Sequence, residues 1–149
     1  MNNSVQPAPM VAAVTGAANP HFDRLGGTET ITRLVDRFYF HMDTLPEAGG
    51  IRVMHPADLS PIKQVLVLYL TEWMGGPKQY SQERGHPRLR FKHSAFAIGP
   101  TERDAWMACM RLALEEAVLD ATLKGQLEQS FMKIADFIRN DQGHLHEPR

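Results

Sequence analysis

The sequence of 149 residues contains one cysteine, Cys109, and lacks any long apolar run. A single cysteine excludes an intrachain disulfide framework and a cysteine-rich zinc site, and it favours a reducing compartment. No apolar stretch approaches the roughly 18 residues of a membrane span, and the N-terminal stretch lacks the basic start and apolar block of a signal peptide. We therefore expect a cytoplasmic protein without a membrane partner.

The sequence also lacks an excess of charge of either sign. It has 16 Lys and Arg residues against 17 Asp and Glu residues, which gives a net charge of -1. Such a chain has no global field to attract a phosphate backbone, so we expect no nucleic-acid partner. The 43% of apolar and 22% of charged residues are typical of a soluble globular protein, and the length favours one domain.

Apolar residues at helical spacing predict four main helices, and alternating strand patterns are absent, so the predicted class is all-α. Thr28 is a possible N-cap of the first helix, and Ser60 is the expected cap of the second. We expect a flexible N-terminal tail over 1–21, one folded domain over 22–139 and a flexible C-terminal tail over 140–149. No heptad seam is visible, and we expect a monomer. The predicted helical stretches cover 31–42, 62–73, 106–117 and 123–138.

A long stretch without periodicity, 74–99, separates the second and third predicted helices and is rich in glycine, proline and basic residues. Irregular segments of this length inside a small domain are usually functional or disordered. His93 follows a short segment that Pro87 opens, with Arg90 and Lys92 beside it. A histidine in this setting suits an axial ligand to a haem. A half-buried structural histidine is the alternative that the residues alone leave open.

Three stretches together carry a family resemblance. They are LGGTETITRLVDRFYFHMD, HPADLSP and LTEWMGGPKQYSQERGHPRLRFKHSAFAIGPTERDAWMACM. Over residues 22–138 the chain resembles the truncated haemoglobins of group II. The resemblance implies a two-over-two helical sandwich globin fold around haem b, with a long irregular segment before the proximal histidine.

The resemblance also implies roles for individual residues. His93 matches the proximal ligand, whose Nε2 binds iron while Nδ1–H donates to a backbone carbonyl. Tyr39, preceded by Phe38, matches the distal tyrosine, and Trp106 matches the tryptophan that marks this group. For both, plain core packing is the alternative. His55 stands where the family often has Phe or Tyr, so the polarity above the iron is expected to depend on pH.

Further positions complete the expected haem contacts. Ile62 and Leu66 are expected to form an apolar wall on the distal side. Tyr80, Arg90 and Lys92 are candidates to bind the propionates, with His86 as a weaker one and a solvated basic loop as the alternative. Other residues are assigned no ligand role: Cys109, Met107 and Met110 as core, and His41, His144 and His146 as surface residues. The full set of predicted cofactor contacts is His93, Phe38, Tyr39, His55, Ile62, Leu66, Tyr69, Tyr80, Arg90, Lys92, Phe96 and Trp106.

Three functions remain open at this point. The first is a haem protein that binds oxygen, carbon monoxide or nitric oxide reversibly, as oxygen transport requires. The second is a haem enzyme that dioxygenates nitric oxide or reduces peroxide, with an external reductase because no flavin or nicotinamide motif occurs. Donors at Tyr39 and Trp106, each contributing on the order of 1.5–3 kcal/mol, would slow oxygen release and favour redox chemistry over bulk transport. The third is a cofactor-free helical interaction module.

Overall fold

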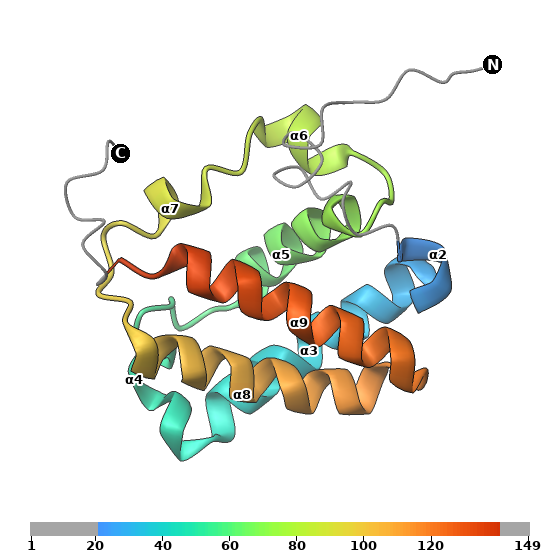
Figure 1. Cartoon of the computed structure of the whole chain (residues 1–149). Coiled ribbons are helices and arrows are strands. Elements are labelled where there is room, and N and C mark those ends of the chain that lie inside the picture. Colours follow the sequence, from blue (N-terminus) through green and yellow to red (C-terminus); the bar gives the residue numbers. More distant parts are fainter. Residues whose placement is uncertain (1–20, 141–149) are drawn as a thin grey trace.

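The computed structural model describes residues 21–140, and within them every regular element is a helix (Figure 1). The predicted all-α class is therefore confirmed. Most of the predicted tails 1–21 and 140–149 lies outside the described residues, including His144 and His146; only His21 and Asn140 are described. None of the described helices is both long and apolar enough to cross a membrane. In chain order the elements are α2 (Phe22–Leu25), α3 (Gly27–Thr44), the 3-10 helix η1 (Pro46–Ala48), α4 (Gly49–Arg52), α5 (Ser60–Trp73), α6 (Gln79–Arg84), α7 (Leu89–Lys92), α8 (Pro100–Ala117) and α9 (Ala121–Ile138).

The four long helices form two layers. Helix α3 packs on both α5 and α8, and α8 packs on α9, so the pair α3 and α5 lies against the pair α8 and α9 (Figure 1). The apolar stripes predicted from the spacing meet between these layers. Fully buried examples are Leu34 and Phe38 of α3, Met110 of α8 and Phe131 of α9. Each such side chain contributes about 1.5–3 kcal/mol by leaving water, and this burial fixes the rotation of each helix.

Two predicted helix starts are wrong by one or two residues. Helix α3 begins at Gly27 with Gly26 as its N-cap, and not with Thr28 as the cap. Gly26 has φ +112°, a left-handed conformation that glycine adopts readily, and it allows α3 to follow α2 directly. Ser60 is the first residue of α5, and its N–H donates to the Asp58 carboxylate at 3.0 Å. The N-cap is Leu59, without a side-chain capping bond, so Ser60 lies one residue inside the helix.

Backbone hydrogen bonds and close packing connect α2 to the end of α5. The Phe22 N–H donates to the Met74 carbonyl at 2.8 Å, and the Gly76 N–H donates to the Thr71 carbonyl at 2.8 Å. The Phe22 ring lies so close to Gly76 that a Cβ added there would come within 2.6 Å of it. Gly76 is therefore required by close packing in the turn that opens the irregular segment.

The irregular segment contains two short helices, α6 and α7. Glu72 of α5 is buried, and its Oε1 accepts the Ser81 N–H at 2.8 Å, which fastens α6 to the end of α5. No such side-chain contact to α5 is seen for α7, which packs on α9. The segment is thus tied down at both ends by different helices.

His41 was expected at the surface, and this expectation is wrong. Only 8% of His41 is exposed, and its Nε2 lies 2.9 Å from Oε1 of Glu116 on α8. Arg37 donates from Nε to the same oxygen at 2.7 Å. The bond from Arg37 has the larger effect on the Glu116 carboxyl, and with the bond from His41 it lowers the pKa of this carboxyl to about 2. The periodicity of α3 did not reveal that α8 covers this side of it.

The sulfur-containing residues of α8 lie in the core, as predicted. Met107, Cys109 and Met110 are all fully buried. Burial raises the pKa of the Cys109 thiol to about 11, so the thiol stays protonated and unreactive at neutral pH.

Candidate functional site

His93 follows α7 directly, and its imidazole is oriented by the backbone one turn earlier. Nδ1 lies 2.7 Å from the Leu89 carbonyl oxygen. Because a carbonyl oxygen only accepts, Nδ1 carries the proton and Nε2 keeps its lone pair. Burial lowers the pKa of the imidazole, the Leu89 bond opposes this, and the charges of His55 and Lys92 lower it further. His93 is therefore a neutral imidazole with Nε2 available, the form that binds a metal ion.

The loop after His93 is held by the last described residue of the chain. The Asn140 side chain donates to the Phe96 carbonyl at 2.7 Å and accepts the Ile98 N–H at 3.0 Å. The Asn140 N–H also donates to the Ile98 carbonyl at 3.0 Å. We expected Asn140 to begin a flexible tail, but it is a structural part of the domain. One polar residue after an apolar helix gives no sequence signal for such a role.

Tyr39 lies on the buried side of α3, beside Phe38. These residues are 4% and 1% exposed, and the Phe38 ring contacts both the Tyr39 ring at 4.9 Å and the Trp106 ring at 5.1 Å between centroids. Burial raises the pKa of the Tyr39 phenol, so the hydroxyl keeps its proton. That hydroxyl has no hydrogen-bond partner among residues 21–140. Tyr39 is thus a buried residue whose hydroxyl makes no hydrogen bond within the described residues.

His55 lies close to Tyr39, with 5.9 Å between the ring centroids and 74° between the ring planes. Its Nδ1 is 2.8 Å from the Ile51 carbonyl oxygen, so Nδ1 is the protonated nitrogen here too. The charge of His55 also acts on His93. The structure therefore brings the Tyr39 and His55 rings into contact, and His55 influences the pKa of His93.

One face of α5 supplies the apolar residues expected around the site. Ile62, Leu66 and Tyr69 are half-buried and pack against the core. Their spacing of four and three residues places them on one side of the helix. Burial raises the pKa of the Tyr69 phenol, and the Tyr69 ring contacts the Tyr80 ring at 5.7 Å.

The residues expected at the haem edge differ in their contacts and in their exposure to solvent. Lys92 donates from Nζ to the Tyr80 hydroxyl at 2.8 Å, so these two candidates bind each other across the irregular segment. Arg90 is half-buried, and its guanidinium lies 5.2 Å from the centre of the Phe137 ring. His86 is exposed, and 39% of Phe96 is exposed. The Lys92–Tyr80 bond is a contact that the sequence did not predict.

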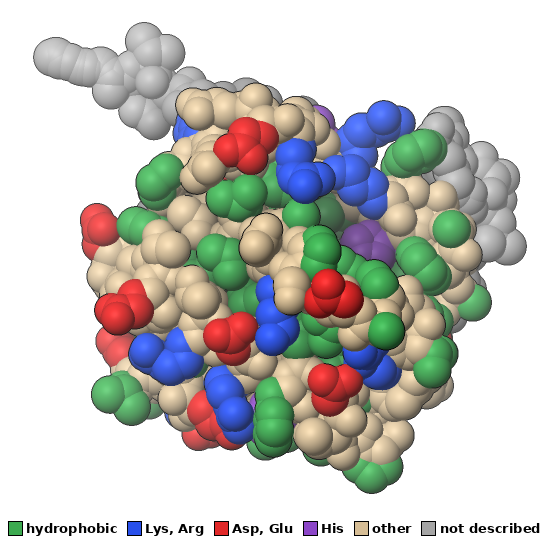
Figure 2. All heavy atoms as spheres, turned by 180° about the vertical axis from the view of Figure 1, so that it is seen from behind, with side chains coloured by type: hydrophobic (Ala, Val, Ile, Leu, Met, Phe, Trp, Pro, Cys, Tyr) green, Lys and Arg blue, Asp and Glu red, His purple; other side chains and the backbone are tan. Residues whose placement is uncertain are grey.

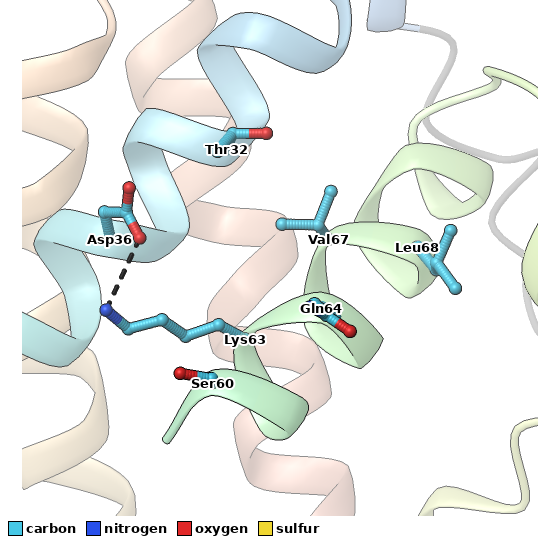
Figure 3. Close-up of a pocket in the computed structure, with 7 residues that line it drawn as sticks. All are labelled: Thr32, Asp36, Ser60, Lys63, Gln64, Val67 and Leu68. Carbon is cyan, nitrogen blue, oxygen red and sulfur yellow. Dashed lines mark ion pairs between the residues drawn. The ribbon is translucent and has the colours of Figure 1, made fainter. Parts of the chain in front are cut away.

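A groove of about 610 Å³ lies elsewhere, between α3 and α5 (Figure 3). Lys63 and Asp36 form an ion pair of 3.5 Å across it. None of the predicted site residues lines this groove, so it is separate from the site around His93. The lining residues are Thr32, Asp36, Ser60, Lys63, Gln64, Val67 and Leu68.

The donor groups of the site fit a haem. One neutral imidazole, His93, offers a free Nε2 of the kind that binds haem iron on one side. The buried Tyr39 hydroxyl and the half-buried Trp106 indole offer N–H or O–H donors to a bound ligand. Apolar residues of α5 and α3 supply the dry surroundings that a porphyrin requires.

Comparison with known proteins gives consistent results. The family model described as bacterial-like globin matches residues 20–140. Group 2 truncated hemoglobin YjbI of Bacillus subtilis (strain 168) is 34% identical over 106 residues, which cover 68% of this chain and 78% of that protein.

Solved structures agree in fold. The group II 2-on-2 hemoglobin of Agrobacterium tumefaciens has 41% identity and a TM-score of 0.77, covering 80% of this chain and 92% of that one. The cold-adapted truncated hemoglobin of the Antarctic marine bacterium Pseudoalteromonas haloplanktis TAC125 has 36% identity and a TM-score of 0.79. The match covers 83% of this chain and 99% of that one. The predicted two-over-two fold is therefore confirmed.

Proposed function

Because this chain belongs to the bacterial-like globin family, as a truncated haemoglobin of group II, we propose that it binds haem b through His93 and takes up diatomic ligands reversibly. Oxygen, carbon monoxide and nitric oxide are the expected ligands. The observation that carries the proposal is the 2.7 Å contact from His93 Nδ1 to the Leu89 carbonyl, which leaves Nε2 of this half-buried imidazole free. We further propose that the protein works as a cytoplasmic monomer, in which the buried Cys109 stays reduced.

Tyr39 and Trp106 determine how tightly a ligand is held in this proposal. A bound haem would supply the iron that takes up the diatomic ligand. The Tyr39 hydroxyl donates a hydrogen bond to the ligand, and the Trp106 indole N–H donates a second. A charge-assisted hydrogen bond in a dry pocket contributes about 1.5–3 kcal/mol. Ile62 and Leu66 keep bulk water away from these bonds, which increases their strength.

The test is an absorption spectrum of the protein reconstituted with one equivalent of hemin, in the ferric, ferrous and carbon monoxide forms. Wild type is expected to give a sharp Soret band that shifts with each ligand. His93→Ala is expected to lose this band, whereas His86→Ala, the loss of an exposed histidine on the same segment, is expected to keep it. Absence of stoichiometric haem uptake by wild type would refute the proposal and leave a cofactor-free helical module.

A haem enzyme is the second candidate function, and the pair of donors favours it. The Phe38 ring contacts both Tyr39 and Trp106, so the two side chains that carry donors pack against the same residue. Two donors slow the release of oxygen and polarise an O–O or N–O bond, which suits nitric oxide dioxygenation or peroxide reduction. Turnover requires an external reductase. Consumption of nitric oxide or peroxide is measured with a reductase present, and a rate equal to that of free hemin would exclude this function.

A further inference from the structure

The irregular segment that carries His93 has a charge opposite to that of the rest of the chain. Residues 78–93 contain five Lys or Arg residues and one carboxylate, Glu83, which gives a formal charge of +4. The whole chain has -1, so all other residues together carry -5. We call the five cations the basic surface; they are Lys78, Arg84, Arg88, Arg90 and Lys92.

The basic surface is open to solvent and largely uncompensated. Lys78, Arg84, Arg88 and Lys92 are exposed, and none of these four pairs with a carboxylate of the described residues. Most described arginines elsewhere are paired with a carboxylate: Arg37, Arg52, Arg103 and Arg111 each bind an Asp or Glu. Figure 2 shows Lys and Arg side chains gathered in one region of the surface, close to a histidine.

Exposed aromatic rings lie beneath two of these cations. Phe91 is 46% exposed with the Arg88 guanidinium 4.3 Å from its ring centre, and Phe137 is 53% exposed with that of Arg90 at 5.2 Å. Aromatic and arginine side chains are enriched at protein interfaces, where a ring and a guanidinium can be buried together. Phe40 of α3 is also exposed under an arginine, Arg37, but Arg37 binds Glu116, whereas Arg88 pairs with no carboxylate of the described residues. This chemistry favours an acidic protein over a lipid surface or a nucleic acid as the partner.

We propose that the basic surface docks an acidic electron-carrier protein that reduces the haem. The inference rests on the proposed function, because His93, the proposed iron ligand, lies in the same segment. The electron then has a short path from the docked carrier to the iron. The carrier is oxidised by one electron and ferric iron is reduced to ferrous; no covalent bond forms or breaks. Complementary charge steers such small, transient contacts and raises their association rate.

The first experiment measures the reduction of the ferric holoprotein by a reduced [2Fe–2S] ferredoxin or a reduced flavodoxin, both acidic carriers, under carbon monoxide in stopped flow. The wild-type rate is expected to fall as salt is added, because salt screens exposed charges. Arg84→Glu is expected to lower the rate at low salt about three- to tenfold, and the difference is expected to vanish at high salt. Arg33→Glu is the matched control, an equal charge change at an exposed arginine of α3, and its rate is expected to stay near that of wild type.

The second experiment needs no turnover. The ferrous carbon monoxide form is titrated with the oxidised carrier, and amide chemical shifts are followed by NMR. Shifts confined to 78–93 and the facing end of α9, absent in Arg84→Glu, would support the docking site. Equal rates for Arg84→Glu and Arg33→Glu, or shifts elsewhere, would overturn it, as would binding to anionic phosphatidylglycerol vesicles or an oligonucleotide but to neither carrier.

Haem uptake separates this proposal from the one it rests on. If the protein binds haem through His93 but Arg84→Glu leaves the reduction rate unchanged, the proposed function stands and the docking site is refuted. A protein that takes up no haem has neither.

Discussion

The change Tyr39→Phe tests the distal site without disturbing its packing. The ring of Tyr39 is 4% exposed and held between Phe38 and His55, and phenylalanine keeps those ring contacts. The hydroxyl bonds no residue in the described range, so its removal strands no partner inside the protein. The whole effect should therefore fall on the bound ligand. Loss of a charge-assisted bond of about 1.5–3 kcal/mol corresponds to a roughly 10- to 150-fold faster release of oxygen.

The assay is stopped-flow displacement of oxygen by carbon monoxide from the ferrous protein. Tyr69→Phe is the matched control, because Tyr69 is a half-buried tyrosine that lies on α5 against Tyr80. Its oxygen release is expected to stay within about twofold of wild type. Thermal unfolding of the two apoproteins checks that neither variant is misfolded. An oxygen release rate in Tyr39→Phe equal to that of Tyr69→Phe would show that the tyrosine donates nothing to the ligand.

Three further predictions concern the frame of the site. Gly76→Ala forces a methyl group against the Phe22 ring and is expected to lower the free energy of unfolding, measured with urea, by about 1–3 kcal/mol. Gly125→Ala adds a methyl group in open space within α9, and it is expected to leave this free energy unchanged or to raise it. Glu116→Gln is expected to lower the free energy of unfolding by only about 1 kcal/mol above pH 5, because this carboxylate is partly exposed. The pKa of the Glu116 carboxyl is lower in the folded protein than in the unfolded chain. The difference in stability from wild type is therefore expected to disappear as the pH falls from about 4.5 to 2. Asn140→Ala is expected to speed the transfer of haem to excess apomyoglobin. Asn140→Asp is expected to have a smaller effect, because it keeps the oxygen that accepts the Ile98 N–H. Equal transfer rates in wild type and both variants would show that Asn140 does not support the loop after His93.

The long helices could be predicted because their information is local. Burial of Leu34, Phe38 and Phe131 follows from a spacing that repeats every three or four residues, and that spacing is visible without any knowledge of the partner helix. The break after α8 was also visible, since Asp120 caps α9 by accepting the Leu123 N–H at 3.1 Å. The resemblance places the proximal ligand at His93, which stays a prediction, and periodicity alone left a structural histidine as the alternative.

What the sequence did not reveal depends on contacts between distant segments. The bond from His41 to Glu116 spans 75 residues, and that from Asn140 to Phe96 spans 44. Neither residue type carries a local pattern, so His41 was assigned to the surface and Asn140 to a tail. The correction at Gly26 has another cause, because a glycine in a left-handed conformation can cap a helix without any side-chain oxygen.

The two sides of the site are supported in different ways, and this difference predicts how each responds to mutation. Tyr39 and Trp106 lie on α3 and α8, long helices whose packing against each other does not depend on either side chain alone. Substitutions there should change ligand rates in a protein that still folds and binds haem. His93 follows a helix of four residues, and the loop after it is held through Asn140. Changes around His93 should therefore act first on haem retention, and only through it on ligand binding. Measuring haem loss beside oxygen release in every variant separates these two classes of effect.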